Sequence, residues 1–227
     1  MPARVSAVYR IGIDVGGTFT DLAAVDERGA VVIAKSASTP RDPSDGLMEG
    51  LGLLAAELGL DLAGLLARTE SIIHGTTVAT NALLERKGAK VGLLTTEGHR
   101  DVIEMREGLK DDRYNLRMPP PVPLVPRARR LPVRERLRFD GTVAIPLGTT
   151  SLAAAIDRLA RDGVEAVAVC YLHSYRNPRH EQLTGRAVGR RMPRAFVSLS
   201  SEVLPQIKEY ERVWTTVVNA YVGPALA

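Results

Sequence analysis

The segment from Tyr9 to Asp21 constrains the fold of this chain more than any other stretch. An apolar run over residues 8–15 leads into the pair Gly16-Gly17, and a second strand-like run follows over residues 18–25. So short a connection between two extended segments predicts an antiparallel β-hairpin. Glycine pairs are common in hairpin turns, so the glycines alone indicate no more than a turn.

The polar side chains around this turn favour phosphate binding over a plain turn. Glycines tolerate positive φ and let backbone N–H groups approach a phosphate with no Cβ in the way. Asp14 could hold Mg²⁺ through water, because Mg²⁺ keeps several waters when it binds to proteins. Asp21 has an alternative role, which is pairing across the hairpin. The candidate cofactor-binding residues are Asp14, Gly16, Gly17, Thr18, Thr20 and Asp21, with Asp14 as the metal ligand.

Composition places the chain among ordinary globular proteins. Its 227 residues are 45% hydrophobic and 25% charged, which suits one large domain or two small ones. No stretch approaches the roughly 20 apolar residues of a membrane helix. Residues 1–4 lack the apolar core of a signal peptide, so we expect a cytoplasmic protein with no membrane partner. Cys170 lies in the apolar run 166–172, where a buried thiol is expected.

The net charge of +4 is modest, but arginines are concentrated between residues 127 and 138. A nucleic-acid surface would combine such a patch with stacking aromatic side chains. Phe139 is the sole aromatic residue nearby. The pattern therefore favours a strand edge that faces solvent or a subunit, and no nucleic-acid partner is expected.

The order of expected elements indicates an α/β protein. Strands are expected over residues 8–15, 18–25, 30–36, 71–75, 91–96, 166–172 and 195–199, with a hairpin at Asp140-Gly141. Helices are expected from Pro43 to Gly59 and over residues 78–86, 152–161, 178–191 and from 210. The proline-rich and arginine-rich residues 108–130 predict an extended connection. Such alternation predicts a sheet flanked by helices.

Several blocks of residues carry a family resemblance. They are Ile13–Asp21, His74–Glu85, Leu93–Val102, Leu124–Arg127, Ser198–Val203, Tyr210–Arg212 and Val218–Pro224. The first block alone resembles the phosphate hairpin of the actin, hexokinase and Hsp70 ATPase superfamily. Together the blocks resemble the N-terminal region of the hydantoinase A family, which includes 5-oxoprolinase and the acetone carboxylase β subunit.

The resemblance implies a ribonuclease-H-like half of the actin, Hsp70 and hexokinase type, with an inserted αβ segment. The N-terminal region would span residues 1–205, and residues 206–227 would begin a second half. Either residues 71–95 or residues 166–199 could supply the strand-helix-strand of the first half. The second choice resembles the superfamily more and places the insertion at about residues 40–150. No second Asp-x-Gly-Gly-Thr follows Asp21, so a truncated member that is incomplete by itself is expected.

The resemblance also implies an activity. Members of the family are ATP-dependent cyclic amide hydrolases of the N-methylhydantoinase A and 5-oxoprolinase type, which phosphorylate a carbonyl oxygen before ring hydrolysis. The implied cofactors are ATP and Mg²⁺, and the implied partner is a hydantoinase B-type subunit. The substrate would be a small cyclic amide or another carbonyl compound. Two alternatives stay open: a sugar or metabolite kinase of the same superfamily, and a non-catalytic truncated module.

Residues outside the hairpin complete the candidate site. His74 to Thr77 end a strand and open a helix, a place where ligands and anions bind in α/β sheets. Thr76 or Thr77 could instead be a helix cap, His74 a buried histidine and Arg106 half of a structural ion pair. His173 and His180 are expected at the surface. The candidate catalytic residues are Asp14, His74 and Thr76, and the substrate candidates are His74, Thr76, Thr77, Asn81 and Arg106.

Overall fold

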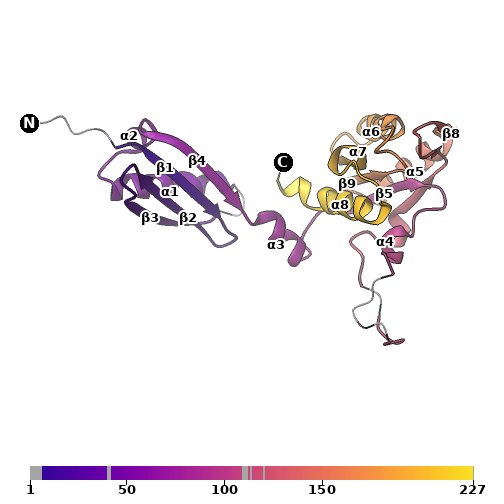
Figure 1. Cartoon of the computed structure of the whole chain (residues 1–227), viewed down its shortest axis with the longest axis horizontal. Helices are drawn as coiled ribbons and strands as arrows, with labels where there is room; N and C mark the ends of the chain where they lie inside the picture. Colours follow the sequence, from indigo (N-terminus) through magenta and orange to yellow (C-terminus); the bar gives the residue numbers. More distant parts are fainter. Residues whose placement is uncertain (1–6, 40–41, 109–111, 113, 120, 227) are drawn as a thin grey trace, which may run out of the picture. The chain divides into compact units, whose positions relative to one another are not determined.

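The computed structural model describes residues 7–39, 42–108, 112, 114–119 and 121–226. The chain divides into two compact units, Met1–Glu85 and Arg86–Ala227, which can be followed by colour in Figure 1. Each unit has its own sheet and its own apolar core. In the described ranges, no helix combines the length and the apolar character needed to cross a bilayer.

The sheet of the first unit has the strand order β3-β2-β1-β4. Short turns make β1 (Tyr9–Val15), β2 (Phe19–Asp26) and β3 (Val31–Ala37) an antiparallel meander, as the sequence predicts. A helical crossover then brings β4 (Thr69–Thr76) back parallel to β1. The crossover contains helices α1 (Pro43–Glu57) and α2 (Leu62–Leu66), and α3 (Val78–Leu84) follows β4.

One face of this sheet is apolar because alternate residues of each strand point the same way. Ile11 and Ile13 of β1 and Leu22 of β2 pack against Leu51 and Leu54 of α1. Asp42 caps α1 by accepting a hydrogen bond from the Ser44 amide at 2.9 Å. At the other end, Gly59 has a φ of +68°, which suits a glycine that follows a helix. The predicted helix is confirmed.

The second unit contains a four-stranded parallel sheet with the order β10-β9-β5-β6. Its strands are β5 (Val91–Thr96), β6 (Arg130–Val133), β9 (Ala166–Cys170) and β10 (Phe196–Leu199). Every residue of β5 and β9 is buried, as expected for central strands covered on both faces. The smaller hairpin of β7 (Arg136–Leu137) and β8 (Val143–Ile145) turns at Gly141, where φ is +87°.

Helices cover both faces of this second sheet (Figure 1). Val167 and Val169 of β9 join the core formed by α5 (Thr149–Arg161) and α6 (Arg179–Arg191). The alternate residues of β9 face the other way, and α8 (Glu209–Val222) packs against β9 and β10. Two further short helices, α4 (Val102–Met105) and α7 (Ser200–Val203), contact α8.

The structure differs from the expected domain organisation. The sequence favours residues 166–199 as the strand-helix-strand of the first half, and this prediction is wrong, because β9 and β10 belong to the second sheet. It is β4 that pairs with β1, so residues 43–85 belong to the first unit and are not an insertion. The remainder of the expected insertion, from Arg86 to about residue 150, belongs to the second unit. Residues 209–222, within the segment expected to begin a second half, form α8, whose Val213 and Val217 are buried in the second unit.

Two other sequence expectations have mixed outcomes. Within the expected connection 108–130, residues 109–111, 113 and 120 lie outside the described residues, and a short 3₁₀ turn occupies Arg127–Arg129. The expected solvent-facing arginine patch holds for Arg127 and Arg134, which are exposed. It is wrong for Arg130, which is fully buried and donates to Val125 O and to Glu104. A buried guanidinium needs these acceptors.

Candidate functional site

The turn of the β1–β2 hairpin presents free backbone amides. Gly16 N–H donates to Phe19 O at 3.0 Å and closes the turn. In the part of the chain that the structure describes, the amides of Gly17 and Thr18 donate to no other group. Consecutive unpaired amides at a turn form a concave binding surface for anions. The turn can therefore receive a phosphate group.

The two glycines are needed for close approach and not for positive φ. Neither Gly16 nor Gly17 has a positive φ, so that part of the sequence argument is wrong. A Cβ on Gly16 would lie 3.0 Å from Phe19 O, and one on Gly17 would lie 3.2 Å from Asn81 Nδ2. Asn81 of α3 thus contacts the turn, and its side chain donates to Thr77 Oγ1 at 3.4 Å.

Ser38 supports the turn and is a residue that sequence reasoning missed. Its Oγ donates to Gly16 O at 2.8 Å, and its N–H donates to Thr18 O at 2.9 Å. The Thr20 hydroxyl is fully buried and lies 3.2 Å from Ser38 Oγ. The alternation of β3 places Ser38 on the same face as the buried Ser36, but its contact with the turn depends on the pairing of Ala37 with Phe19, which the sequence does not show.

Asp14 is an exposed carboxylate on the open face of the sheet. Its neighbours Ile13 and Val15 are buried, so Asp14 points away from the core. It is paired across the hairpin with Asp21, which forms an ion pair with Lys35 at 2.8 Å. No hydrogen bond or ion pair engages the Asp14 side chain within the described ranges. Asp14 can therefore accept a hydrated cation, which would suit Mg²⁺ bound through water.

The strand β4 separates two residues that the sequence places in one site. Gly75 is the register partner of Asp14, whereas His74 is the partner of Ile13. His74 therefore points to the face opposite to Asp14. Its side chain is exposed, so the alternative of a buried histidine is wrong.

The two threonines after His74 have structural contacts. Thr76 Oγ1 donates to Val15 O at 3.2 Å and accepts from Val78 N–H at 3.2 Å. The N-cap residue of α3 is Thr77, and its side chain makes no capping hydrogen bond, so the alternative of a side-chain cap is not confirmed. The structure thus brings together the turn, Thr77 and Asn81 in the first unit. Arg106, the remaining substrate candidate, belongs to the second unit.

The second unit contains a buried polar network that sequence reasoning did not find. Glu135 accepts from Thr96 Oγ1, and its Oε2 lies 2.8 Å from His180 Nδ1. Burial raises the pKa of Glu135, although hydrogen bonds from His180 and Thr96 oppose that effect. His180 is only 4% exposed, so its expected surface position is wrong. Cys170 is buried as predicted, and burial raises the pKa of its thiol to about 11.

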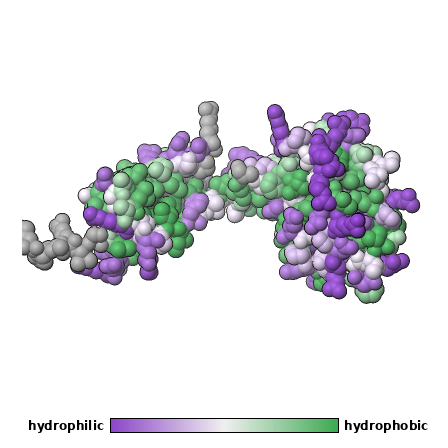
Figure 2. Space-filling view, turned by 90° about the horizontal axis from the view of Figure 1, so that it is seen from above, coloured by the Kyte–Doolittle hydropathy of each residue, from purple (hydrophilic) through white to green (hydrophobic). Residues whose placement is uncertain are grey.

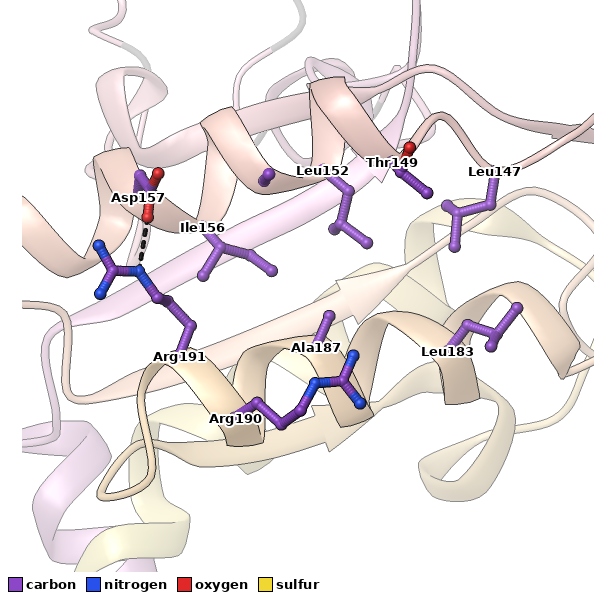
Figure 3. A pocket seen from close by; sticks show the side chains of 10 residues that line it. Leu147, Thr149, Leu152, Ile156, Asp157, Leu183, Ala187, Arg190 and Arg191 are labelled. Atoms are coloured by element: carbon purple, nitrogen blue, oxygen red, sulfur yellow. Dashed lines mark hydrogen bonds and ion pairs between the residues drawn. The ribbon is translucent and has the colours of Figure 1, made fainter.

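An apolar groove of about 590 Å³ lies between α5 and α6. Figure 3 shows Leu152 and Ile156 on α5 facing Leu183 and Ala187 on α6. An ion pair of 2.7 Å between Arg191 and Asp157 closes one end. The groove offers apolar contact but no nucleophile or metal ligand set; across the described chain no cluster of three metal-binding side chains occurs.

Residues 10–192 match the family model described as the hydantoinase/oxoprolinase N-terminal region. The chain belongs to this family. It is 46% identical over 220 residues to the caprolactamase subunit alpha of Pseudomonas jessenii, covering 96% of this chain and 32% of that protein. It is 34% identical to the acetone carboxylase beta subunit of Xanthobacter autotrophicus, covering 95% of this chain and 32% of that subunit.

Two solved structures of related proteins have the same fold as this chain. The nucleotide-free structure of acetone carboxylase matches with a TM-score of 0.89 at 30% identity, covering 96% of this chain and 33% of that one. The ATP-dependent caprolactamase from Pseudomonas jessenii matches with a TM-score of 0.83 and 46% identity, covering 96% and 32%. The α/β fold predicted from the sequence is confirmed, and the chain spans about a third of the length of these relatives.

Proposed function

We propose that this chain is the phosphate-binding N-terminal part of an ATP-dependent hydrolase that opens a small cyclic amide. The observation that carries the proposal is the hairpin turn, where the unpaired amides of Gly17 and Thr18 lie next to the unpaired carboxylate of Asp14. Relatives named as ATP-dependent caprolactamase and 5-oxoprolinase support the class of reaction.

Each residue of the turn has a distinct task in this proposal. The amides of Gly17 and Thr18, with the Thr18 hydroxyl, hold phosphate oxygens, since hydrogen bonds to an anion are stronger than neutral ones. Asp14 orients the water shell of Mg²⁺, and Ser38 and Thr20 fix the turn. Bound ATP would supply a phosphoryl group that converts a carbonyl oxygen into a leaving group. Catalysis of this kind depends on positioning and on neutralising phosphate charge.

Residues outside the turn complete the proposed site. Asn81 and Thr77 border the turn and are the substrate candidates nearest to it in the first unit. Thr76 positions the strand end through its bonds to Val15 and Val78. We also propose a hydantoinase B-type partner and a cytoplasmic location. The printed names of two relatives, a subunit alpha and a beta subunit, support an enzyme with several subunits.

Calorimetric titration with Mg-ATP tests the proposal. Asp14→Asn should weaken binding at least about tenfold, which corresponds to about 1.4 kcal/mol. Glu57→Gln removes the same charge from the exposed end of α1 and should leave the affinity unchanged. Equal affinity of the two variants would exclude the role of Asp14.

Product analysis separates this reaction from that of a kinase of the same superfamily. The experiment incubates candidate cyclic amides and ATP with an enzyme assembly that contains this chain. Ring-opened product together with inorganic phosphate supports the proposal. A stable phosphorylated product would instead show a kinase.

A further inference from the structure

A second cavity, of about 450 Å³, lies in the second unit at the carboxyl ends of its central strands. His99 follows β5, and Leu172 and His173 follow β9. In the order β6-β5-β9-β10, the chain leaves β5 toward β6 on one side and later returns to β9 on the other. The gap between β5 and β9 is therefore the topological switch point, where open parallel sheets bind their ligands.

Three cationic side chains line this cavity, and only one of them, Lys208, forms an ion pair with a carboxylate among the described residues. The Arg136 guanidinium donates from Nη1 to His99 Nε2 at 2.9 Å, an imidazole in place of a carboxylate. Considering the described residues alone, the Arg106 side chain has no hydrogen bond or ion pair. Lys208 differs, because Glu107 and Glu211 lie 3.6 and 3.3 Å from its Nζ. Among the described residues that line the cavity, Arg106 and Arg136 are thus the cations without a carboxylate partner.

Backbone strain is concentrated around the same cavity. Positive φ occurs at four non-glycine residues among those described, and three of them, Arg106, His173 and Lys208, line the cavity. Arg106 has φ 55° and ψ −148°, a region that side-chain-bearing residues rarely adopt. Such a backbone conformation is unfavourable and persists where the surroundings impose it, which is common at ligand sites.

The two histidines that line the cavity have hydrogen-bonding groups without a partner in the described part of the protein. His173 Nδ1 is buried and has no hydrogen-bond partner in the described structure. Burial lowers the pKa of His99, and the nearby Arg136 and His173 lower it further against the opposing effect of Glu209. A neutral His99 accepts from Arg136 and can still donate through its other nitrogen. A buried nitrogen without a partner is costly unless a ligand or water satisfies it.

We propose that this cavity binds a small oxyanion, a carboxylate or a phosphate, with Arg106 and Arg136 as its ligands. A guanidinium presents parallel N–H groups that match the two oxygens of either anion. Glu209 also lines the cavity, which disfavours ligands of high negative charge and offers an acceptor for an N–H of the bound molecule. The site belongs to the second unit and does not depend on the phosphate-binding role proposed for the hairpin.

Titration of the 227-residue protein with inorganic phosphate and, separately, with acetate tests this site. The histidine ring signals of His99 and His173, followed by NMR, report binding at the cavity and not at the hairpin. Binding with a Kd on the order of 1 mM is expected for one of the probes. Arg106→Gln and Arg136→Gln should each raise that Kd at least about tenfold. The probe that binds more tightly identifies the class of oxyanion.

Two further variants keep the test decisive. Arg190→Gln removes the same charge from the exposed surface of α6 and should leave binding unchanged. Arg106→Lys keeps the charge but not the paired N–H groups, so it should restore part of the affinity. Absence of saturable shifts at His99 and His173 with both probes, or binding that survives both glutamine substitutions, would overturn the proposal.

Discussion

Single residues at the hairpin show how close packing, and not backbone conformation, can require glycine. Gly16 and Gly17 both have ordinary φ values, yet each faces a neighbour that a Cβ would crowd. At Gly16 the neighbour is the backbone oxygen of Phe19, and at Gly17 it is the end of the Asn81 side chain. Backbone yields less than the tip of a side chain, so the two positions should differ in their tolerance.

We therefore predict that Gly16→Ala is more destabilising than Gly17→Ala. The first should lower the free energy of unfolding by about 1–3 kcal/mol, the usual cost of overpacking, and the second by less than about 1 kcal/mol. Urea unfolding measures both. Gly12→Ala, where a Cβ would meet nothing within 4 Å, is the matched control. Equal effects of Gly16→Ala and Gly12→Ala would contradict the argument.

The carboxyl group of Glu135 is buried, and burial disfavours its ionised form. Its folded-state pKa is raised, mainly by burial. A raised pKa means that its contribution to stability is fully present below the unfolded pKa of about 4.3 and is lost as pH rises through the folded pKa. Glu135→Gln cannot ionise, so this loss should disappear in the variant.

The prediction is that the unfolding free energy of Glu135→Gln, relative to the original protein, increases with pH above about 4.3. The gain should be about 1.4 kcal/mol for each unit by which the pKa is raised. Denaturant unfolding at a series of pH values measures the difference, and the exposed Glu57→Gln gives the baseline. Parallel curves for the two variants would show that Glu135 titrates normally in the fold.

Among the elements, those with clear periodicity were predictable and the pairing between distant strands was not. The meander, α1 and the runs of β5 and β9 follow from alternation, helical spacing and continuous apolar stretches. The partner of β1 did not follow, because residues 71–75 and 166–172 both predict a strand and sequence separation does not choose between them. The hairpin turn and the exposure of Asp14 beside it were predictable from the sequence, whereas Ser38 acts through a contact that folding creates.

The strand β4 has an edge that is unpaired in the described structure. It pairs with β1 on one side, and Ile72 and Ile73 are 47% and 71% exposed. Figure 2 shows hydrophobic surface on the first unit. An exposed strand edge offers free N–H and C=O groups for pairing with another strand.

Hydrogen exchange on the 227-residue protein distinguishes a free edge from a covered one. Alternate amides of β4 point away from β1, and they should exchange rapidly while the amides of β1 remain protected. The central strand β9, paired on both sides, serves as the internal control. Strong protection at every amide of β4 would show that another strand covers this edge in solution.

The whole molecule consists of two units with separate cores, and this separation has a thermodynamic consequence. The core of the first unit contains Leu54, and that of the second contains Leu159, both almost fully buried. Because each core lies within one unit, a cavity in one removes contacts from that unit alone. Two-state behaviour is expected of each unit and not of the chain as a whole.

We predict that Leu54→Ala and Leu159→Ala shift different unfolding transitions, each by about 2–5 kcal/mol, the usual cost of emptying a buried leucine site. Calorimetry monitors the two transitions, and hydrogen exchange read separately at β1 and β9 assigns each to its unit. Leu53→Ala, on the exposed side of α1, should shift neither by more than about 0.5 kcal/mol. If Leu54→Ala lowered the protection of β9 as much as that of β1, the units would unfold as one cooperative body, and the oxyanion titrations would then have to be read as a property of the entire chain.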